Sequence, residues 1–130
     1  MNSEGPLPLS VRRKLSRPAL DAFFRIGAQW GLKNEEARVL LGRPSRSTYW
    51  RWKKDHKGAI GTSSLKRISY ILGIYKALQM HFTSKEQADG WIHRPNSAAL
   101  FAGRSALERM MDGRINDLRV VREYLENELV

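Results

Sequence analysis

Residues 34–54 read NEEARVLLGRPSRSTYWRWKK, and this stretch decides the fold that the sequence predicts. Asn34 is a good N-cap for a short helix over 34–41, which has acidic side chains in its first turn. Gly42-Arg43-Pro44 then ends this helix in a tight turn. Ser45 caps a second helix that runs to about the end of the stretch. A short helix, a tight turn and a basic helix together match a helix-turn-helix motif.

The second helix of the motif carries side chains that suit double-stranded DNA. Tyr49 and Trp52 lie three residues apart, so both are expected to point into the core and anchor the helix. The N-terminal end of such a helix enters the major groove, where Arg46 is suited to pair with O6 and N7 of guanine. Lysines farther along add affinity for phosphates. The residues predicted to contact DNA are Ser45, Arg46, Ser47, Thr48, Trp50, Arg51, Lys53 and Lys54.

The positive charge of the chain is concentrated in the same half. The 130 residues include 23 Lys and Arg and 13 Asp and Glu, for a net charge of +10. Residues 1–67 hold 15 of the basic and five of the acidic residues, which leaves eight of each in residues 68–130. Such a one-sided excess is typical of a surface that binds a polyanion. Nucleic acid is the commonest partner of this kind, and an acidic membrane surface is the second.

Helical spacing of apolar residues continues on both sides of the motif. Ser16-Arg17-Pro18 predicts the start of a helix over 16–30, because proline is tolerated in a first turn. Beyond a glycine-containing loop, Thr62 or Ser63 is expected to cap a long helix over 64–82. No segment alternates with the period of a β-strand. The sequence therefore predicts an all-α fold of about seven helices, the last three of which begin near Ser84, Ser105 and Ile115.

This pattern divides the chain into three parts. Residues 1–15 contain three Gly and Pro residues and end in basic residues, which predicts a flexible basic arm. Residues 16–62 form the predicted helix-turn-helix DNA-binding region. Residues 63–130 form a second helical domain of neutral charge balance, in which we expect protein contacts rather than nucleic-acid contacts.

Several classes of function are disfavoured by what the sequence lacks. With no cysteine, the chain has no disulfide framework, no Cys-rich zinc finger and no thiol nucleophile. Its three histidines, His56, His81 and His93, do not have the spacing of a helical metal site. No acid–base pair and no phosphate-binding glycine loop is evident, so we expect no enzyme activity, no metal and no cofactor.

No apolar run approaches the roughly 20 residues that span a membrane. The basic residues near the start of the chain are not followed by the uninterrupted apolar stretch of an export signal, because Arg17, Asp21 and Arg25 intervene. We therefore expect no membrane association and a cytoplasmic location.

From about Leu65 onward the sequence resembles the Xre/MbcA/ParS family of bacterial antitoxins. A tryptophan followed by an apolar residue, then Pro-Asn, then a glycine before a helix start is the family pattern, and Ala106 stands where a proline is common. The order and spacing carry the resemblance. The matching segments are Ile68–Ile74, Ala88-Asp89-Gly90-Trp91-Ile92, Arg94-Pro95-Asn96, Gly103-Arg104-Ser105-Ala106-Leu107 and Asp112-Gly113, with Leu118, Val121, Tyr124 and Leu125 in the last helix.

The resemblance implies an antitoxin of a type II toxin–antitoxin system. Its partner would be a RES-domain toxin, an enzyme that consumes NAD, and the C-terminal domain would cover the entrance to the toxin's active site. The N-terminal helix-turn-helix would bind promoter DNA and repress the operon, and a homodimer is typical. On this basis residues 63–130 are a toxin-binding and dimerisation domain. The candidate toxin-binding residues are Arg94, Asn96, Arg104, Arg119, Arg122, Glu123 and Glu126.

Two other functions remain open at the level of sequence. The chain could be a stand-alone helix-turn-helix regulator whose C-terminal half only dimerises. It could also be a basic RNA-binding or nucleoid protein. A neighbouring gene for a RES-like protein would favour the antitoxin over the regulator. Specific binding to one palindromic operator would oppose the nucleoid protein, because non-specific binding weakens steeply with salt.

Overall fold

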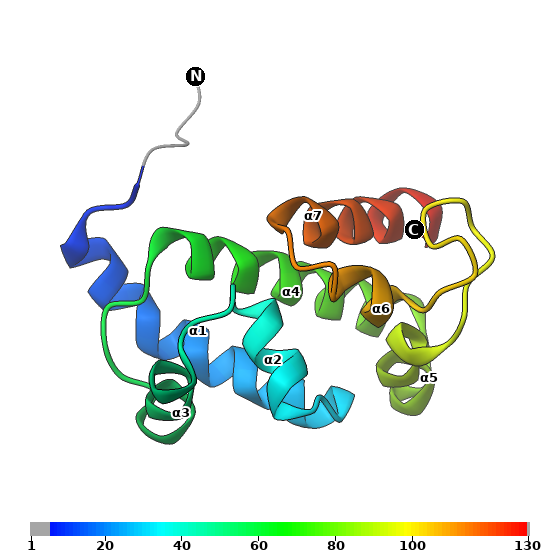
Figure 1. Cartoon of the computed structure of the whole chain (residues 1–130). Coiled ribbons are helices and arrows are strands. Elements are labelled where there is room, and N and C mark those ends of the chain that lie inside the picture. Colours follow the sequence, from blue (N-terminus) through cyan, green and yellow to red (C-terminus); the bar gives the residue numbers. More distant parts are fainter. Residues whose placement is uncertain (1–5, 130) are drawn as a thin grey trace.

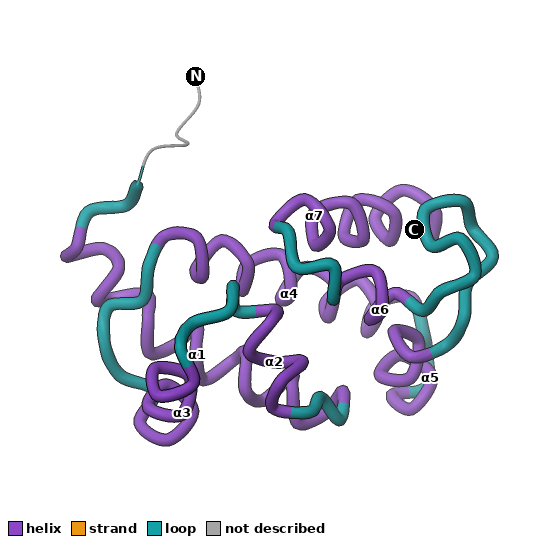
Figure 2. Tube along the Cα trace, in the orientation of Figure 1, coloured by secondary structure: helices purple, strands orange, loops and turns teal. Residues whose placement is uncertain are grey.

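The computed structural model describes residues 6–129, which form seven α-helices and no named strand (Figures 1 and 2). A 3-10 turn, Trp91–His93, follows α5, and a π-helical turn, Leu125–Leu129, follows α7. The predicted all-α fold is confirmed. The helices are α1 (Leu9–Trp30), α2 (Asn34–Leu40), α3 (Arg46–Asp55), α4 (Thr62–His81), α5 (Lys85–Gly90), α6 (Ala106–Met110) and α7 (Ile115–Tyr124).

The long helix α4 runs through the middle of the molecule and packs against both halves of the chain. It contacts α1 on one side and α7 on the other (Figure 1). One set of its apolar residues recurs every three or four positions and is buried, so α4 supplies the centre of one continuous core. These buried positions are Leu65, Ile68, Ile71, Ile74 and Leu78.

Gly73 interrupts the apolar pattern of α4 for a packing reason. A side chain at this position would collide with the guanidinium of Arg122 on α7. The Arg122 side chain therefore occupies the space beside Gly73, where α4 and α7 are in contact. The helix tolerates the roughly 1 kcal/mol that glycine costs relative to alanine because its tertiary contacts are extensive.

The first helix begins seven residues earlier than the sequence predicts. Residues 9–15, which we expected in a flexible arm, form its first two turns, and Pro18 lies inside the helix. Ser16 does not cap this helix. Instead its hydroxyl is buried and accepts a hydrogen bond from the backbone N–H of Ile60 at 2.9 Å. Residues 1–5, the rest of the predicted arm, lie outside the described residues.

A second contact explains why the start of α1 is ordered. The N–H of Leu7 donates to the hydroxyl of Thr62 at 2.9 Å, and the Arg12 guanidinium donates to the carbonyl of Leu7 at 3.2 Å. Thr62 therefore binds the segment before α1 rather than capping α4, and Gly61 is the N-cap residue of α4. The predicted cap Ser45 is confirmed, and Ser84 and Ser105 cap the helices that were expected to begin near them, since each hydroxyl accepts the backbone N–H three residues on.

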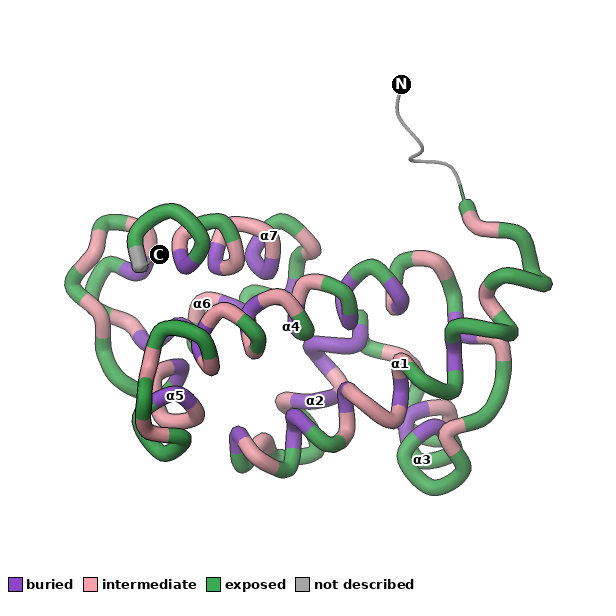
Figure 3. Tube along the Cα trace, turned by 180° about the vertical axis from the view of Figure 1, so that it is seen from behind, coloured by how far each residue is buried: buried purple, intermediate pink, exposed green. Residues whose placement is uncertain are grey.

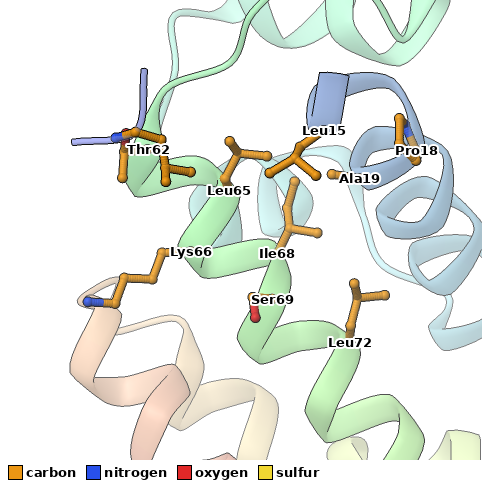
Figure 4. Close-up of a pocket in the computed structure, with 10 residues that line it drawn as sticks. Leu15, Pro18, Ala19, Thr62, Leu65, Lys66, Ile68, Ser69 and Leu72 are labelled. Atoms are coloured by element: carbon orange, nitrogen blue, oxygen red, sulfur yellow. The ribbon is translucent and has the colours of Figure 1, made fainter. Parts of the chain in front are cut away.

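An apolar groove of about 570 Å³ lies between the first half of α1 and the start of α4. In Figure 4, Leu15 and Ala19 of α1 face Leu65 and Ile68 of α4 across this groove. Leu15 and Leu72 remain partly exposed there, at 45% and 38%.

Over residues 6–129, no helix combines the length and the apolar character that crossing a membrane would require.

Candidate functional site

The outward face of α3 presents the side chains that the sequence predicts to contact DNA. Arg46, Ser47, Trp50, Arg51, Lys53 and Lys54 are all exposed, and Figure 3 shows most of α3 in the exposed colour. Tyr49 and Trp52 are buried on the opposite side, at 2% and 8% exposure, as predicted. One face of α3 is therefore fixed in the core, and the other is a solvent-facing basic surface.

Asn34 anchors α3 to the start of α2. Its side-chain oxygen accepts hydrogen bonds from the Tyr49 hydroxyl at 2.9 Å and from the Lys53 ammonium at 2.6 Å. The sequence predicts Asn34 as the N-cap of α2, but the N-cap residue is Lys33 and the Asn34 amide serves the next helix instead. Burial raises the pKa of Tyr49, which keeps this hydroxyl a hydrogen-bond donor.

Glu35 joins α2, the turn and α3 in a single network. Its carboxylate accepts two hydrogen bonds from Arg38, at 2.7 and 3.2 Å, and lies 3.7 Å from the Arg46 guanidinium. Arg38 also donates to the carbonyl of Pro44 at 2.8 Å, which holds the turn. The hydrogen bond from Arg38 lowers the pKa of Glu35, so the carboxylate stays charged beside both cations. Sequence reasoning placed Glu35 only as a favourable first-turn acid.

The hydroxyls at the start of α3 are partly used within the protein. The Ser45 hydroxyl accepts the N–H of Thr48 at 3.2 Å and donates to the Thr48 hydroxyl at 2.9 Å. Ser47 lies at the rim of this cluster, with its hydroxyl 3.3 Å from that of Ser45. Of the three hydroxyls, Ser47 is exposed and the least committed to capping, while Thr48 is half-buried.

The turn between α2 and α3 rests on the second half of the protein. Gly42 and Arg43 both have a positive φ, of 99° and 58°. Beneath them the Arg67 side chain of α4 is only 9% exposed and donates to the carbonyl of Gly113 at 2.8 Å. Burial lowers the pKa of Arg67, and the nearby charge of Arg43 lowers it further. This arginine therefore links the helix-turn-helix directly to the turn before α7.

The candidate toxin-binding residues fall on three segments of the C-terminal half. Arg94 follows the 3-10 turn and donates to the carbonyl of Gln87 at 3.1 Å. Asn96 and Arg104 belong to the loop before α6. The remaining four residues lie on α7 and the turn that follows it, and they are Arg119, Arg122, Glu123 and Glu126.

The loop that holds Asn96 and Arg104 is tied by its own backbone. The N–H of Asn96 donates to the carbonyl of Arg104 at 3.1 Å, and the N–H of Gly103 donates back to Asn96 at 2.9 Å. The Asn96 side chain accepts the N–H of Ala98, and the Arg104 guanidinium makes two hydrogen bonds to Asp112, at 3.2 and 3.1 Å. The conformation of this loop is therefore fixed by its hydrogen bonds.

The charged residues of α7 form pairs along the helix surface. Arg119 binds Glu123 at 2.8 Å, and Arg122 binds Glu126 at 3.0 Å, each one helical turn apart. The second pair lies beside Gly73 in a groove of about 470 Å³ between α4 and α7. These four residues present alternating charge at the surface. In residues 6–129 no group of three His, Asp or Glu side chains is placed to hold a metal ion.

Comparisons with known proteins match the two parts of the chain to two different domain families. Residues 10–73 match the family described as the antitoxin Xre-like helix-turn-helix domain, and residues 77–128 match the antitoxin Xre/MbcA/ParS C-terminal toxin-binding domain. The protein y4oB of Sinorhizobium fredii, described as uncharacterized, is 47% identical over 107 residues, which cover 82% of this chain and 81% of that protein. No solved structure matches the chain. The two family matches meet inside α4.

Proposed function

This chain belongs to the Xre/MbcA/ParS family of antitoxins, and from that premise we propose that it neutralises a RES-type, NAD-consuming toxin and represses its own operon. The observation that carries the proposal is the joining of two modules on one helix. A helix-turn-helix with an exposed basic face and a toxin-binding domain of neutral charge share α4 and one core. A protein of this build is suited to hold DNA and a toxin at the same time.

The DNA-binding part of the proposal rests on α3. Arg46 is assigned to guanine in the major groove, with Ser47 and Arg51 reaching base edges or phosphates. Lys54, near the end of the helix, adds affinity for the phosphate backbone. The Glu35 carboxylate lies 3.7 Å from the exposed Arg46 guanidinium, and this weak contact leaves the guanidinium available for a base. We propose a homodimer, since two copies would place two such helices on a palindromic operator.

The toxin-binding part rests on the surface of the C-terminal half. Its alternating charges are suited to a polar substrate cleft, because side chains of both signs can replace the hydrogen bonds that a bound dinucleotide makes. The loop with Asn96 and Arg104 is held by its own hydrogen bonds and by Asp112, which favours it as the element that enters the cleft. Arg119 and Glu123 on α7 would then contact the rim.

Co-expression tests the toxin-binding part directly. We expect the protein encoded by the neighbouring gene to lower cellular NAD when expressed alone. Co-expression with this chain should restore NAD and give one complex on size exclusion. Charge reversal by Arg104→Glu together with Arg119→Glu should weaken the complex while leaving operator binding intact. Absence of both a complex and an NAD recovery would contradict the toxin assignment and leave the chain as a DNA-binding regulator.

A promoter assay tests repression separately. Binding of purified protein to the DNA upstream of its own gene should exceed binding to unrelated DNA of equal length at about 0.15 M salt. A reporter placed behind that promoter should be repressed by the intact chain. Equal binding to both DNAs at every salt concentration would instead indicate a non-specific basic protein.

A further inference from the structure

Trp50 is an exposed aromatic side chain at the centre of the basic face of α3. Its exposure is 51%, and no other Trp, Tyr or Phe among residues 6–129 is exposed. Its neighbours on the same face are Arg46, one helical turn before it, and Arg51 and Lys54. A large apolar ring surrounded by cations costs hydration free energy unless a partner covers it.

The Trp50 ring is held in place before any partner arrives. It packs edge to face on the Tyr49 ring, with centroids 5.4 Å apart and planes at 76°. The Lys53 ammonium lies 5.5 Å from its centroid, in the range of a cation–π contact. Tyr49 and Lys53 are themselves fixed by hydrogen bonds to Asn34. The Trp50 ring is therefore a preorganised apolar surface rather than a mobile side chain.

The side chains around the Trp50 ring indicate which group of a partner it would contact. The cations around it favour a polyanion, and among the base edges of the major groove the apolar group is the C5-methyl of thymine. Trp50 lies four residues after Arg46, which is about 6 Å along the helix. That distance corresponds to about two base-pair steps of 3.4 Å.

We propose that Trp50 reads the C5-methyl group of a thymine about two base pairs from the guanine that Arg46 contacts. The inference rests on the proposed binding of operator DNA. It names one more base pair of the operator that the protein recognises, and the methyl group through which it does so. Trp50 could instead contact a protein partner or a deoxyribose of the DNA backbone. The experiment below distinguishes both of these from a thymine contact.

The experiment removes that methyl group and nothing else. The full-length protein is first used to select its preferred duplex from a random library. Each thymine of the selected site is then replaced in turn by deoxyuridine, and Kd is measured by fluorescence anisotropy at fixed salt. We expect about a fourfold loss of affinity at one thymine per half-site, the effect of about one buried methyl group. Trp50→Ala should abolish this discrimination, and Trp50→Phe should retain it.

The outcomes separate this inference from the proposed function. If the protein selects a site but tolerates every deoxyuridine with unchanged Kd, contact with a sugar or a protein is favoured and the thymine inference fails alone. Discrimination that survives in Trp50→Ala also overturns it. If no sequence is selected, operator binding and this inference fail together. A preference for guanine that is lost in Arg46→Ala but kept in Trp50→Ala would show two things. The Trp50→Ala variant is folded, and Arg46 and Trp50 contact different base pairs.

Discussion

The two halves of the protein treat their charged side chains in opposite ways. On α6, α7 and the turns beside them, the arginines pair with carboxylates: Arg104, Arg109, Arg114, Arg119 and Arg122. On α3, Arg51 and Lys54 have no ion pair within the described residues, and Arg46 has only the 3.7 Å contact with Glu35. Paired arginines give a surface little net field, whereas unpaired ones attract a polyanion. Composition alone reports the net charge; the pairing shows which cations are available for binding.

The same two halves share one apolar core although their surfaces differ. α4 buries one stripe against α1 and another against α7. We therefore ask whether the two halves, which differ in surface charge, also fold and bind independently of each other.

The largest effect is expected from cutting the chain between the halves. A fragment of residues 63–130 retains the helices of the toxin-binding domain but exposes Leu65 and Ile68, which pack toward α1 (Figure 4). We expect it to lose the cooperative thermal transition seen in the full chain, because these side chains then face water. Circular dichroism during heating measures this. A sharp transition in the fragment would show that the second half is an independent domain.

The second effect concerns Asp117, the one carboxylate that is buried among residues 68–128. Asp117 is fully buried and accepts hydrogen bonds from Arg109 and from the guanidinium and backbone of Arg114, at 2.9 to 3.1 Å. Asp117→Ala should lower the free energy of unfolding by about 1.5–3 kcal/mol, because the hydrogen bonds that the two arginines donate to a charged acceptor are lost. Urea denaturation measures the loss. Arg119→Ala is the matched control, since its exposed pair should contribute below about 1 kcal/mol.

The third effect separates the two surfaces. Arg46→Ala with Arg51→Ala should weaken operator binding by about tenfold to a hundredfold, because two groups assigned to DNA are lost. Neutralisation of the toxin should be unchanged. Lys76→Ala, which removes an exposed cation from α4, serves as the charge control. Normal operator binding by the double variant would mean that the contacts to bases come from another part of the chain.

The smallest effect is on the pH dependence of stability. Burial alone would raise the pKa of Asp117, but hydrogen bonds from Arg114 and Arg109 outweigh it and lower that pKa. A lowered pKa gives stability that is present above the unfolded value near 3.9 and is lost as pH falls through the folded value. Stability of the wild type should therefore fall below about pH 4. The curve for Asp117→Asn should be flatter there, and parallel curves would contradict this role.

The elements whose signals are local could be predicted from the sequence. Ser45 caps α3 through an atom three residues away, and Tyr49 and Trp52 share a face because of helical spacing. Signals that depend on distant partners were misread. Ser16 resembles a cap, but its partner is Ile60, 44 residues on. The partners of Asn34 lie 15 and 19 residues on.

The candidate sites show the same limit. Exposure of the α3 side chains followed from the position of its two buried aromatic residues, so that surface was predictable. The contribution of Glu35 and the burial of Arg67 were not, since a charged residue in a helix pattern is expected at the surface. Which residues of the C-terminal half meet a toxin stays a prediction, because its surface pairs are as suited to solvent as to a partner.

Because the two family matches meet at residues 73–77 within an unbroken helix, the junction has a rotational phase as well as a length. Each residue of an α-helix turns the chain by about 100° and advances it by about 1.5 Å. An insertion of a single residue here would swing everything beyond it around the helix axis by more than a quarter turn. Exchange of halves between relatives is therefore constrained to keep the helical register. A protein bound to the second half is therefore held at a fixed rotation and a fixed distance relative to the partner that the first half binds.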